Sequence, residues 1–328
     1  MKPPPAPMHK RLKAARAPAR RQRGAAILMA MIIVTLVVTL AAGMVWQQWR
    51  AVQVEAAERA RTQSAWILGG ALDWARLILR EDARSATRPT ALSEPWAVPL
   101  AEARLSTFLA ADKDNTDDAP DAFLSGAIAD AQARYNLRNL VGADFKVVPT
   151  ELAALERLCQ AVGVSSDVST RLAEGMRDAL ASSSATAPLL PRSIAQLTWL
   201  GLDPQTLSRL DPYVVLLNKV TAVNVNTAPR EVLVATIKGL DLATAERLVQ
   251  MRSRTPFKSL QEVEAQIPGL SPLPPQQLGV KSDFFEVSGR LRLGDRVLEQ
   301  RSLVERLGIE VVVRQREQVS SREQPGGS

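Results

Sequence analysis

The sequence predicts an α+β protein in which a long N-terminal helix packs on a small antiparallel sheet, and a large all-α insertion interrupts that sheet. Three observations support this prediction. An uncharged apolar run, residues 25–46, leads into a segment of good helix formers. Residues 149–278 carry apolar residues at helical spacing. Residues 279–316 instead alternate apolar and polar residues between glycines, as strands do.

The apolar run Ala25–Trp46 contains no charged residue. As a helix it measures about 33 Å, enough to cross a bilayer core, and its backbone polar groups must be paired internally in lipid. Residues 1–24 form a basic segment with eight Lys and Arg and no Asp or Glu, which favours a cytoplasmic N-terminus. We therefore expect a single-pass membrane protein whose C-terminal domain lies across the membrane from the cytoplasm.

Three interpretations compete for this run. A secretory signal peptide has a shorter apolar core and a small-x-small exit, whereas this run ends in bulky residues at 44–46. A plain signal anchor does not explain why the basic segment ends at a glycine. The junction from Arg23 and Gly24 through Ala25 to Met29 resembles a type IV prepilin-like leader, which prepilin peptidase cuts after the glycine. The resemblance implies cleavage between Gly24 and Ala25, with Ala25 as the methylated N-terminal residue.

Position 29 departs from the usual prepilin pattern. Family members usually have Phe first and Glu fifth in the mature chain, and this chain has Ala25 and Met29. In ordinary pilins the glutamate is thought to meet the N-terminal ammonium of the subunit ahead, because an unpaired buried charge is costly. The resemblance therefore narrows to the type II secretion minor pseudopilin K (GspK) family, which typically lacks this acid. On this position alone, Met29 as one more apolar residue of a membrane helix stays open.

Composition restricts the function classes. The net charge of +7 lies in residues 1–24, because removing their eight positive charges leaves −1. His9 is the only histidine and would leave with the leader, so the mature chain lacks an imidazole for a triad or a zinc site. Cys159 is the only cysteine and cannot form an internal disulfide. We expect no catalytic residue, no metal site and no enzyme activity.

The long helix should cover residues 25–84, half in lipid and half in the periplasm, because residues 50–84 lack proline. Gly69-Gly70 is expected to allow a close backbone approach or a kink. Residues 85–148 are assigned to the first part of a pseudopilin-like α/β core. Within them, the acidic residues 112–121 suggest calcium, but their spacing does not fit an EF-hand and a solvated loop is favoured. Calcium is the one cofactor left open.

Two further motifs carry the family resemblance. Residues 130–140 resemble the family's Asp-x-x-Gly-Arg-Phe-Asn-Leu-Asn-x-Leu motif, with Ala133 in place of its glycine, and are interpreted as a strand running into a turn. Within residues 149–278, the family's Asp-Trp-x-Asp signature has no counterpart near residues 176–184, so no metal role follows there. The second matching motif lies at residues 224–229 and comprises Asn224, Asn226, Thr227 and Pro229.

The 224–229 pattern also begins helix-hairpin-helix (SAM-like) modules, and residues 237–270 complete that pattern. A DNA-binding hairpin presents helix N-termini to phosphate. Asp241 places a carboxylate at that point, and residues 222–271 have a net charge of only +1. A helical module reused for protein contact is therefore favoured, and no nucleic-acid partner is expected.

The C-terminal strands should span residues 279–316, with turns at Gly294 and Gly308, and residues 317–328 are predicted as a disordered tail. The GspK resemblance covers nearly the whole chain. It implies a structural subunit at the tip of the periplasmic pseudopilus that supports export of folded proteins across the outer membrane. Implied partners are the I-, J- and H-type minor pseudopilins, the major pseudopilin, prepilin peptidase, the inner-membrane secretion platform and the secreted proteins. The alternative is a membrane-anchored helix-hairpin-helix DNA-binding protein for DNA uptake.

Overall fold

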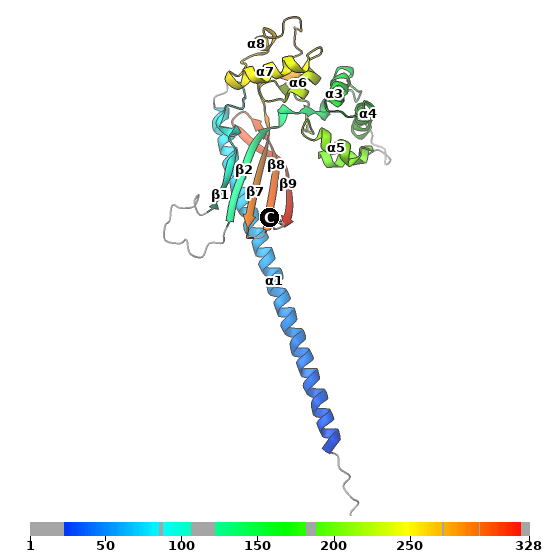
Figure 1. Ribbon diagram of the computed structural model, residues 1–328, viewed down its shortest axis with the longest axis vertical. Helices are drawn as coiled ribbons and strands as arrows, with labels where there is room; N and C mark the ends of the chain where they lie inside the picture. The colour runs from blue at the N-terminus through cyan, green and yellow to red at the C-terminus, as the bar shows by residue number, and fades with distance from the viewer. Residues whose placement is uncertain are drawn as a thin grey trace, which may run out of the picture. The chain divides into compact units, whose positions relative to one another are not determined.

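The computed structural model describes residues 23–84, 88–105, 122–181, 188–270, 272–294 and 296–322. The chain divides into two compact units, residues 1–62 and 63–328. Helices and strands are both present (Figure 1), as the predicted fold class requires. The acidic residues 112–121, expected to form a solvated loop rather than a calcium site, lie outside the described residues.

The described part of the first unit is helical. Helix α1 (Arg23–Ala83) begins there, and its apolar stretch has a mean hydropathy of 2.7 in a helix long enough to cross a membrane. The large apolar side chains of this stretch are exposed; Met29 is 66% exposed. The prediction that residues 25–46 are helical is confirmed.

The second unit contains a five-stranded sheet in the order β1-β2-β7-β8-β9, in which every neighbouring pair is antiparallel. The predicted turn at Gly308 is confirmed: this glycine lies between β8 and β9 with a φ of 63°, which side chains other than glycine rarely adopt. The strands of the sheet are β1 (Leu100–Arg104), β2 (Ala122–Asp130), β7 (Phe284–Leu293), β8 (Arg296–Leu307) and β9 (Glu310–Arg322).

The C-terminal part of α1 packs on this sheet within the second unit. Its buried residues recur at helical spacing and contact strand side chains such as Phe285, Val304 and Leu291. Burying each such side chain contributes roughly 1.5–3 kcal/mol. The buried apolar residues of the helix are Leu68, Leu72, Ala75 and Leu79.

The close approach predicted at Gly69-Gly70 is wrong. A Cβ added at either glycine would meet no atom within 4 Å, and α1 continues through both as regular α-helix. The close approach occurs on the strand instead, where a Cβ added to Gly289 of β7 would lie 3.2 Å from Leu68 Cδ2. The small residue that admits the helix is therefore in the sheet.

The sheet also ends later than predicted. Strand β9 continues to Arg322, where it pairs with Arg296 of β8, so the C-terminal strands extend beyond residue 316. The prediction of a disordered tail from residue 317 is wrong for residues 317–322. Strand β9 is an edge strand that pairs with β8 alone, so its sequence does not need apolar alternation.

Between β2 and β7 the chain forms the helical insertion, with one large apolar core that includes Leu155, Leu172 and Leu233. Two pairs of short parallel strands, β3-β4 and β5-β6, lie within it. Figure 1 shows α6, α7 and α8 above one end of the sheet and α3, α4 and α5 beside them. The helices are α3 (Pro149–Ala161), α4 (Asp167–Ala181), α5 (Pro204–Leu210), α6 (Arg230–Thr236), α7 (Leu242–Arg254) and α8 (Leu260–Glu264). The short strands are β3 (Tyr135–Asn136), β4 (Val214–Val215), β5 (Val223–Asn224) and β6 (Leu278–Gly279). The 3₁₀ helices are η1 (Pro95–Ala97), η2 (Ala131–Ala133), η3 (Leu137–Leu140) and η4 (Ile194–Leu200).

Candidate functional site

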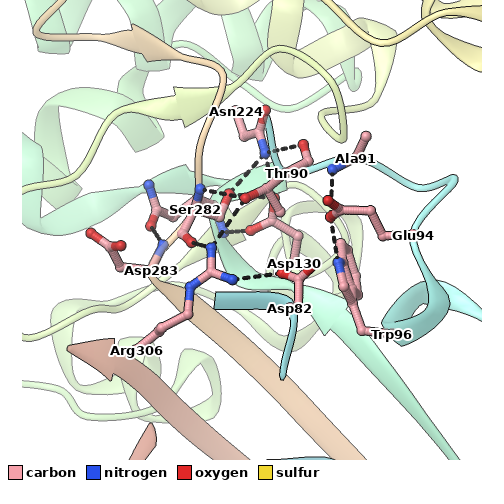
Figure 2. Close-up of polar contacts among 11 residues, drawn as sticks. Asp82, Thr90, Ala91, Glu94, Trp96, Asp130, Asn224, Ser282, Asp283 and Arg306 are labelled. Atoms are coloured by element: carbon pink, nitrogen blue, oxygen red, sulfur yellow. Dashed lines mark hydrogen bonds and ion pairs between the residues drawn. The ribbon is translucent and has the colours of Figure 1, made fainter. Parts of the chain in front are cut away.

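Asp130, the last residue of β2, is the centre of a buried polar network (Figure 2). Asp130 is 4% exposed, and its carboxylate accepts four hydrogen bonds. The donors to Oδ2 are the Thr227 hydroxyl at 2.6 Å, the Ser282 hydroxyl at 2.6 Å and the Asn224 amide at 3.0 Å. The backbone N–H of Gln132 donates to Oδ1 at 2.8 Å. A buried carboxylate is tolerated when its lone pairs are satisfied in this way.

Burial raises the pKa of Asp130 above its usual 3.8, although the hydroxyl, amide and backbone donors act in the opposite direction. Removing the carboxylate from water therefore outweighs the hydrogen bonds that favour its ionised form.

Asn224, in β5, links three separate segments. Its amide Nδ2 donates to Asp130 and contacts both the Thr90 carbonyl at 3.0 Å and the Ser282 hydroxyl at 2.9 Å. Its Oδ1 accepts the backbone N–H of Asn226 at 3.0 Å. The chain leaves the sheet at Asp130 and returns to it just after Ser282, so Asn224 closes the base of the insertion.

Arg306 of β8 joins this network to the end of α1. Its Nη1 forms an ion pair with Asp82 at 2.7 Å, and its Nη2 donates to the Ser282 carbonyl at 2.7 Å and the Thr90 hydroxyl at 3.2 Å. The guanidinium also lies 5.1 Å from the ring centroid of Phe285. One side chain thus connects the long helix, the sheet and the start of the return strand (Figure 2).

The segment after α1 is fixed beside this network by Glu94. Its Oε2 accepts the indole N–H of Trp96 at 2.7 Å and the backbone N–H of Ala91 at 3.1 Å. Burial raises the pKa of Glu94 above 4.5. Trp96 in turn packs edge-on against Phe285, with ring centroids 5.2 Å apart.

The motif at residues 130–140 faces the segment that precedes the 224–229 signature. Asn139 and Thr221 exchange two hydrogen bonds, Nδ2 to the carbonyl at 2.8 Å and the Thr221 N–H to Oδ1 at 3.1 Å. The Gln132 amide donates to the Ala222 carbonyl at 2.9 Å, and the Asn136 amide donates to the Lys219 carbonyl at 2.8 Å. The structure thus brings together two motifs about 90 residues apart in the chain.

The remaining signature residues fix the turn into α6. Asn226 mimics a strand partner, because its Nδ2 donates to the Phe257 carbonyl and its Oδ1 accepts the Phe257 N–H, both at 2.9 Å. Pro229 is the N-cap of α6. The buried guanidinium of Arg252 donates to the Val225 carbonyl, and burial lowers its pKa to about 10.

Asp241, the residue that argued against DNA binding, is the N-cap of α7. Its Oδ1 accepts the backbone N–H of Thr244 at 2.9 Å and its Oδ2 accepts the Thr244 hydroxyl at 2.7 Å. These two bonds lower the pKa of Asp241. The carboxylate occupies the position at which a helix N-terminus would bind phosphate. The assignment of α6 and α7 to the helix-hairpin-helix class stays a prediction.

Gly24 and Ala25 lie in the first turn of α1, and Met29 follows one turn later, all within the first unit. The junction network contains none of them. The sequence analysis missed Thr90, Ser282 and Arg306, because their roles depend on contacts with distant segments and no local pattern marks them.

The network can hold segments together but shows no metal-binding set. Among the described residues, no group of three or more His, Cys, Asp or Glu could hold a metal ion. No buried side-chain nitrogen or oxygen in the same part of the chain lacks a hydrogen-bond partner. The arrangement is therefore a saturated junction between the insertion and the sheet.

Two family models, both described as type II secretion system (T2SS) protein K, match residues 133–219 and 223–281. The chain is 28% identical to the type II secretion system protein K of Pectobacterium carotovorum subsp. carotovorum, over 90% of this chain and 96% of that relative. It is 27% identical to the protein K of Pseudomonas aeruginosa, over 84% of this chain and 86% of that relative. The chain is thus similar to type II secretion system protein K over most of its length. The predicted GspK recognition is thereby confirmed.

The matched ranges cover the insertion, from just after Asp130 to just before Ser282, and include Asn224 and Thr227 of the junction. The fold is similar to a chain in the crystal structure of the GspK-GspI-GspJ complex from the enterotoxigenic Escherichia coli type 2 secretion system. The TM-score is 0.63 at 19% identity, and the match covers 81% of this chain and 99% of that chain. These similarities support a minor pseudopilin of the type II secretion system, and the DNA-uptake alternative is not supported.

Proposed function

We propose that this protein K forms the tip of the periplasmic pseudopilus with other minor pseudopilins and supports export of folded proteins across the outer membrane. It would be anchored in the inner membrane by α1, with a cytoplasmic N-terminus and a periplasmic C-terminal domain. The helix has the length and hydropathy for this anchor. The role is structural, and the junction network serves to hold the insertion on the sheet.

The observation that carries the tip position is Met29. A pilin-like subunit normally offers a glutamate here to the N-terminal ammonium of a neighbour, because a charge buried among apolar helices is costly without a partner. Met29 offers no charge. Other subunits can therefore assemble below this protein K. It lacks the acid that would pair with the N-terminal ammonium of a subunit ahead of it.

Two further features favour this position. The insertion between Asp130 and Ser282 needs space around it, and a tip provides more of that space than side-by-side packing along a shaft. The similar E. coli chain was crystallised as a GspK-GspI-GspJ complex. By analogy, we propose I- and J-type minor pseudopilins as direct partners, with the H-type and major pseudopilins below them and the inner-membrane platform at the base.

Maturation follows from the leader. We propose that prepilin peptidase cuts between Gly24 and Ala25 and that Ala25 becomes the methylated N-terminus. N-terminal sequencing of the membrane-extracted protein, with and without the peptidase, tests this step. A peptidase-dependent end at Ala25 supports it, and an intact Met1 end contradicts it.

The tip position is tested by antibody labelling of pseudopili assembled in cells. We expect one label at one end of each filament for the wild type. Met29→Glu supplies the missing acid and should move label into the shaft, whereas Met31→Glu, a matched acid two residues away, should not. Wild-type label along the shaft, or identical behaviour of the two variants, would contradict the proposal.

A further inference from the structure

A second polar contact joins the insertion to the sheet, on the face opposite to α1. Glu305 of β8 pairs with Phe284 of β7, whereas the next strand pair, Val304 and Phe285, packs against α1. Successive residues of a strand point to opposite faces of the sheet, so Glu305 points away from the helix. Its side chain is 3% exposed, and the Lys219 ammonium forms an ion pair with its Oε1 at 2.7 Å.

Lys219 belongs to a segment that is hydrogen-bonded to the insertion. We call this segment, residues 216–222 between β4 and β5, the strap. The Asn136 amide donates to the Lys219 carbonyl at 2.8 Å and to the Thr221 hydroxyl at 3.0 Å. Asn139 exchanges two more hydrogen bonds with the Thr221 backbone. The strap therefore moves with the insertion, whereas Glu305 moves with the sheet.

The insertion has a hydrophobic core of its own, whose buried residues lie between Tyr135 and Leu278. A smaller apolar cluster spans the insertion and the sheet. Near the two points where the chain leaves and re-enters the sheet, the Asp130 network and the Arg134–Glu286 ion pair, at 2.8 Å, hold the insertion. This junction is the natural pivot for a movement of the whole insertion. The cluster consists of Ala131, Val215, Leu217 and Phe284, with Leu303 packed against it.

Glu305 keeps a charged partner when Lys219 leaves. Arg314 of β9 donates from its Nε to Glu305 Oε2. Burial tends to raise the pKa of Glu305, but the hydrogen bonds from Lys219 and Arg314 together outweigh burial and hold the pKa below 4.5. A buried carboxylate without any partner is costly. Because Arg314 stays in place, breaking the Lys219 contact does not leave such a carboxylate.

Lys219 can also return to water. Its side chain is already 47% exposed in the ion pair, and its ammonium lies 5.1 Å from the ring centroid of Phe284. Ion pairs that reach the surface are weak, because water solvates the charges when they separate. Asp130 differs, because each of its donors is left unpaired inside the protein if the contact breaks. One connection between insertion and sheet is therefore fixed, and the other is releasable.

We propose that the Lys219–Glu305 ion pair is a releasable latch between the insertion and the sheet. When the pair is formed, the strap lies against the sheet. When it breaks, the insertion tilts about the junction at Asp130, away from the face that carries Glu305. The released orientation is a minor population in the wild type, because closure also buries Leu217 of the strap. A protein that binds the released orientation more tightly would increase its population. This inference goes beyond the proposed function and does not depend on the tip position.

The test measures distances between the insertion and the sheet in the full-length protein in detergent. Spin labels are attached at Gln205→Cys in α5 and Glu317→Cys in β9, both exposed positions. The native Cys159 is buried and should stay unlabelled. Pulsed electron paramagnetic resonance gives the distribution of distances, in which the released orientation is a second, minor distance.

Lys219→Met keeps an apolar side chain but removes the charge. We expect it to increase the released population by up to about 5-fold, the effect of losing a surface ion pair. Lys219→Arg keeps the cation and should match the wild type. Lys238→Met, which removes an exposed lysine elsewhere in the insertion, should also match it.

Salt separates the latch from a general loosening of the fold. Raising the ionic strength from about 0.1 M to 1 M shortens the screening length from about 10 Å to 3 Å. The released population should rise with salt in the wild type and change much less in Lys219→Met. The Tm of Lys219→Met should fall by no more than about 4 °C. Equal distance distributions in the wild type and Lys219→Met would overturn the latch. A larger fall in Tm would also overturn it, because the contact would then be part of the folding core.

Discussion

Two aspartates of the insertion region, Asp130 and Asp241, use the same chemistry for different purposes. Each accepts a hydroxyl and a backbone N–H. The partners of Asp241 both belong to Thr244, three residues away, whereas Asp130 binds hydroxyls 97 and 152 residues away. Asp130 is buried and Asp241 is exposed. One carboxylate starts a helix, and the other holds the insertion to the sheet.

The difference appears in the pKa of each group. Burial raises the pKa of Asp130, while the Thr244 backbone and hydroxyl lower that of Asp241. A local cap keeps its carboxylate in water and gains from ionisation. A carboxylate that joins distant segments is buried and loses that water, so the stability it contributes depends on every hydrogen-bond donor being in place.

The largest effect is expected from Asp130→Ala. The substitution leaves four donors without their acceptor inside the protein, among them the hydroxyls of Thr227 and Ser282. We expect a loss of about 3–5 kcal/mol in the free energy of unfolding, or a fall in Tm of about 6–10 °C. Thermal unfolding of the full-length protein in detergent, followed by tryptophan fluorescence, measures it. Asp144→Ala, in an exposed loop, is the control; equal effects would remove the contrast between buried and exposed carboxylates.

A smaller effect is expected from Asn226→Ala. The substitution removes both hydrogen bonds to the Phe257 backbone and leaves a buried carbonyl and N–H unpaired. The cost should be about 2–3 kcal/mol. Asn226→Asp keeps an acceptor for the Phe257 N–H but sets a buried carboxylate against the Phe257 carbonyl, so at neutral pH it should cost at least as much as Asn226→Ala in the same unfolding assay. A neutral Asn226→Ala would mean that this signature residue does not fix the turn into α6.

The pH dependence of Asp130 gives a third, smaller effect. Because its native pKa lies above 3.8, the native state takes up the proton at higher pH than the unfolded chain. The stability from this shift is complete below pH 3.8 and is lost as the pH rises through the native pKa. Relative to Asp130→Asn, which does not titrate, the wild type should therefore gain Tm as the pH falls towards 4. A relative loss of Tm would show that the four donors outweigh burial.

These differences also explain how far the sequence could predict the structure. The turn at Gly308 and the helical apolar run follow from neighbours in the chain, and both are present. The Asp130 network could not be predicted, because its donors come from segments that only the fold brings together. The family motifs at residues 130–140 and 224–229 identify the two parts of this network, but no pattern in the sequence indicates that the two motifs are in contact.

Two sequence predictions, the close approach at Gly69-Gly70 and the end of β9, are wrong for the same reason: each depends on the partner element. Two adjacent glycines in a helix, such as Gly69 and Gly70, are typical of a close packing site. In the contact between α1 and the sheet, however, the small residue is Gly289 of β7. The end of β9 lacks apolar alternation because an edge strand pairs on one side only. Its partner β8 determines its length, and that pairing cannot be read from β9 itself.

The smallest effect is expected from Asp241→Ala, and this variant also tests what the hairpin can bind. Loss of the two bonds to Thr244 removes only a local cap, so the Tm should fall by no more than a few degrees. The substitution also exposes the N-terminus of α7, the position that a DNA-binding hairpin would present to phosphate. Because residues 222–271 carry a net charge of only +1, we expect no salt-dependent binding of duplex DNA by the wild type or the variant, measured by fluorescence anisotropy. Binding gained by Asp241→Ala would show that this carboxylate, rather than the weak charge of the module, is what keeps nucleic acid away.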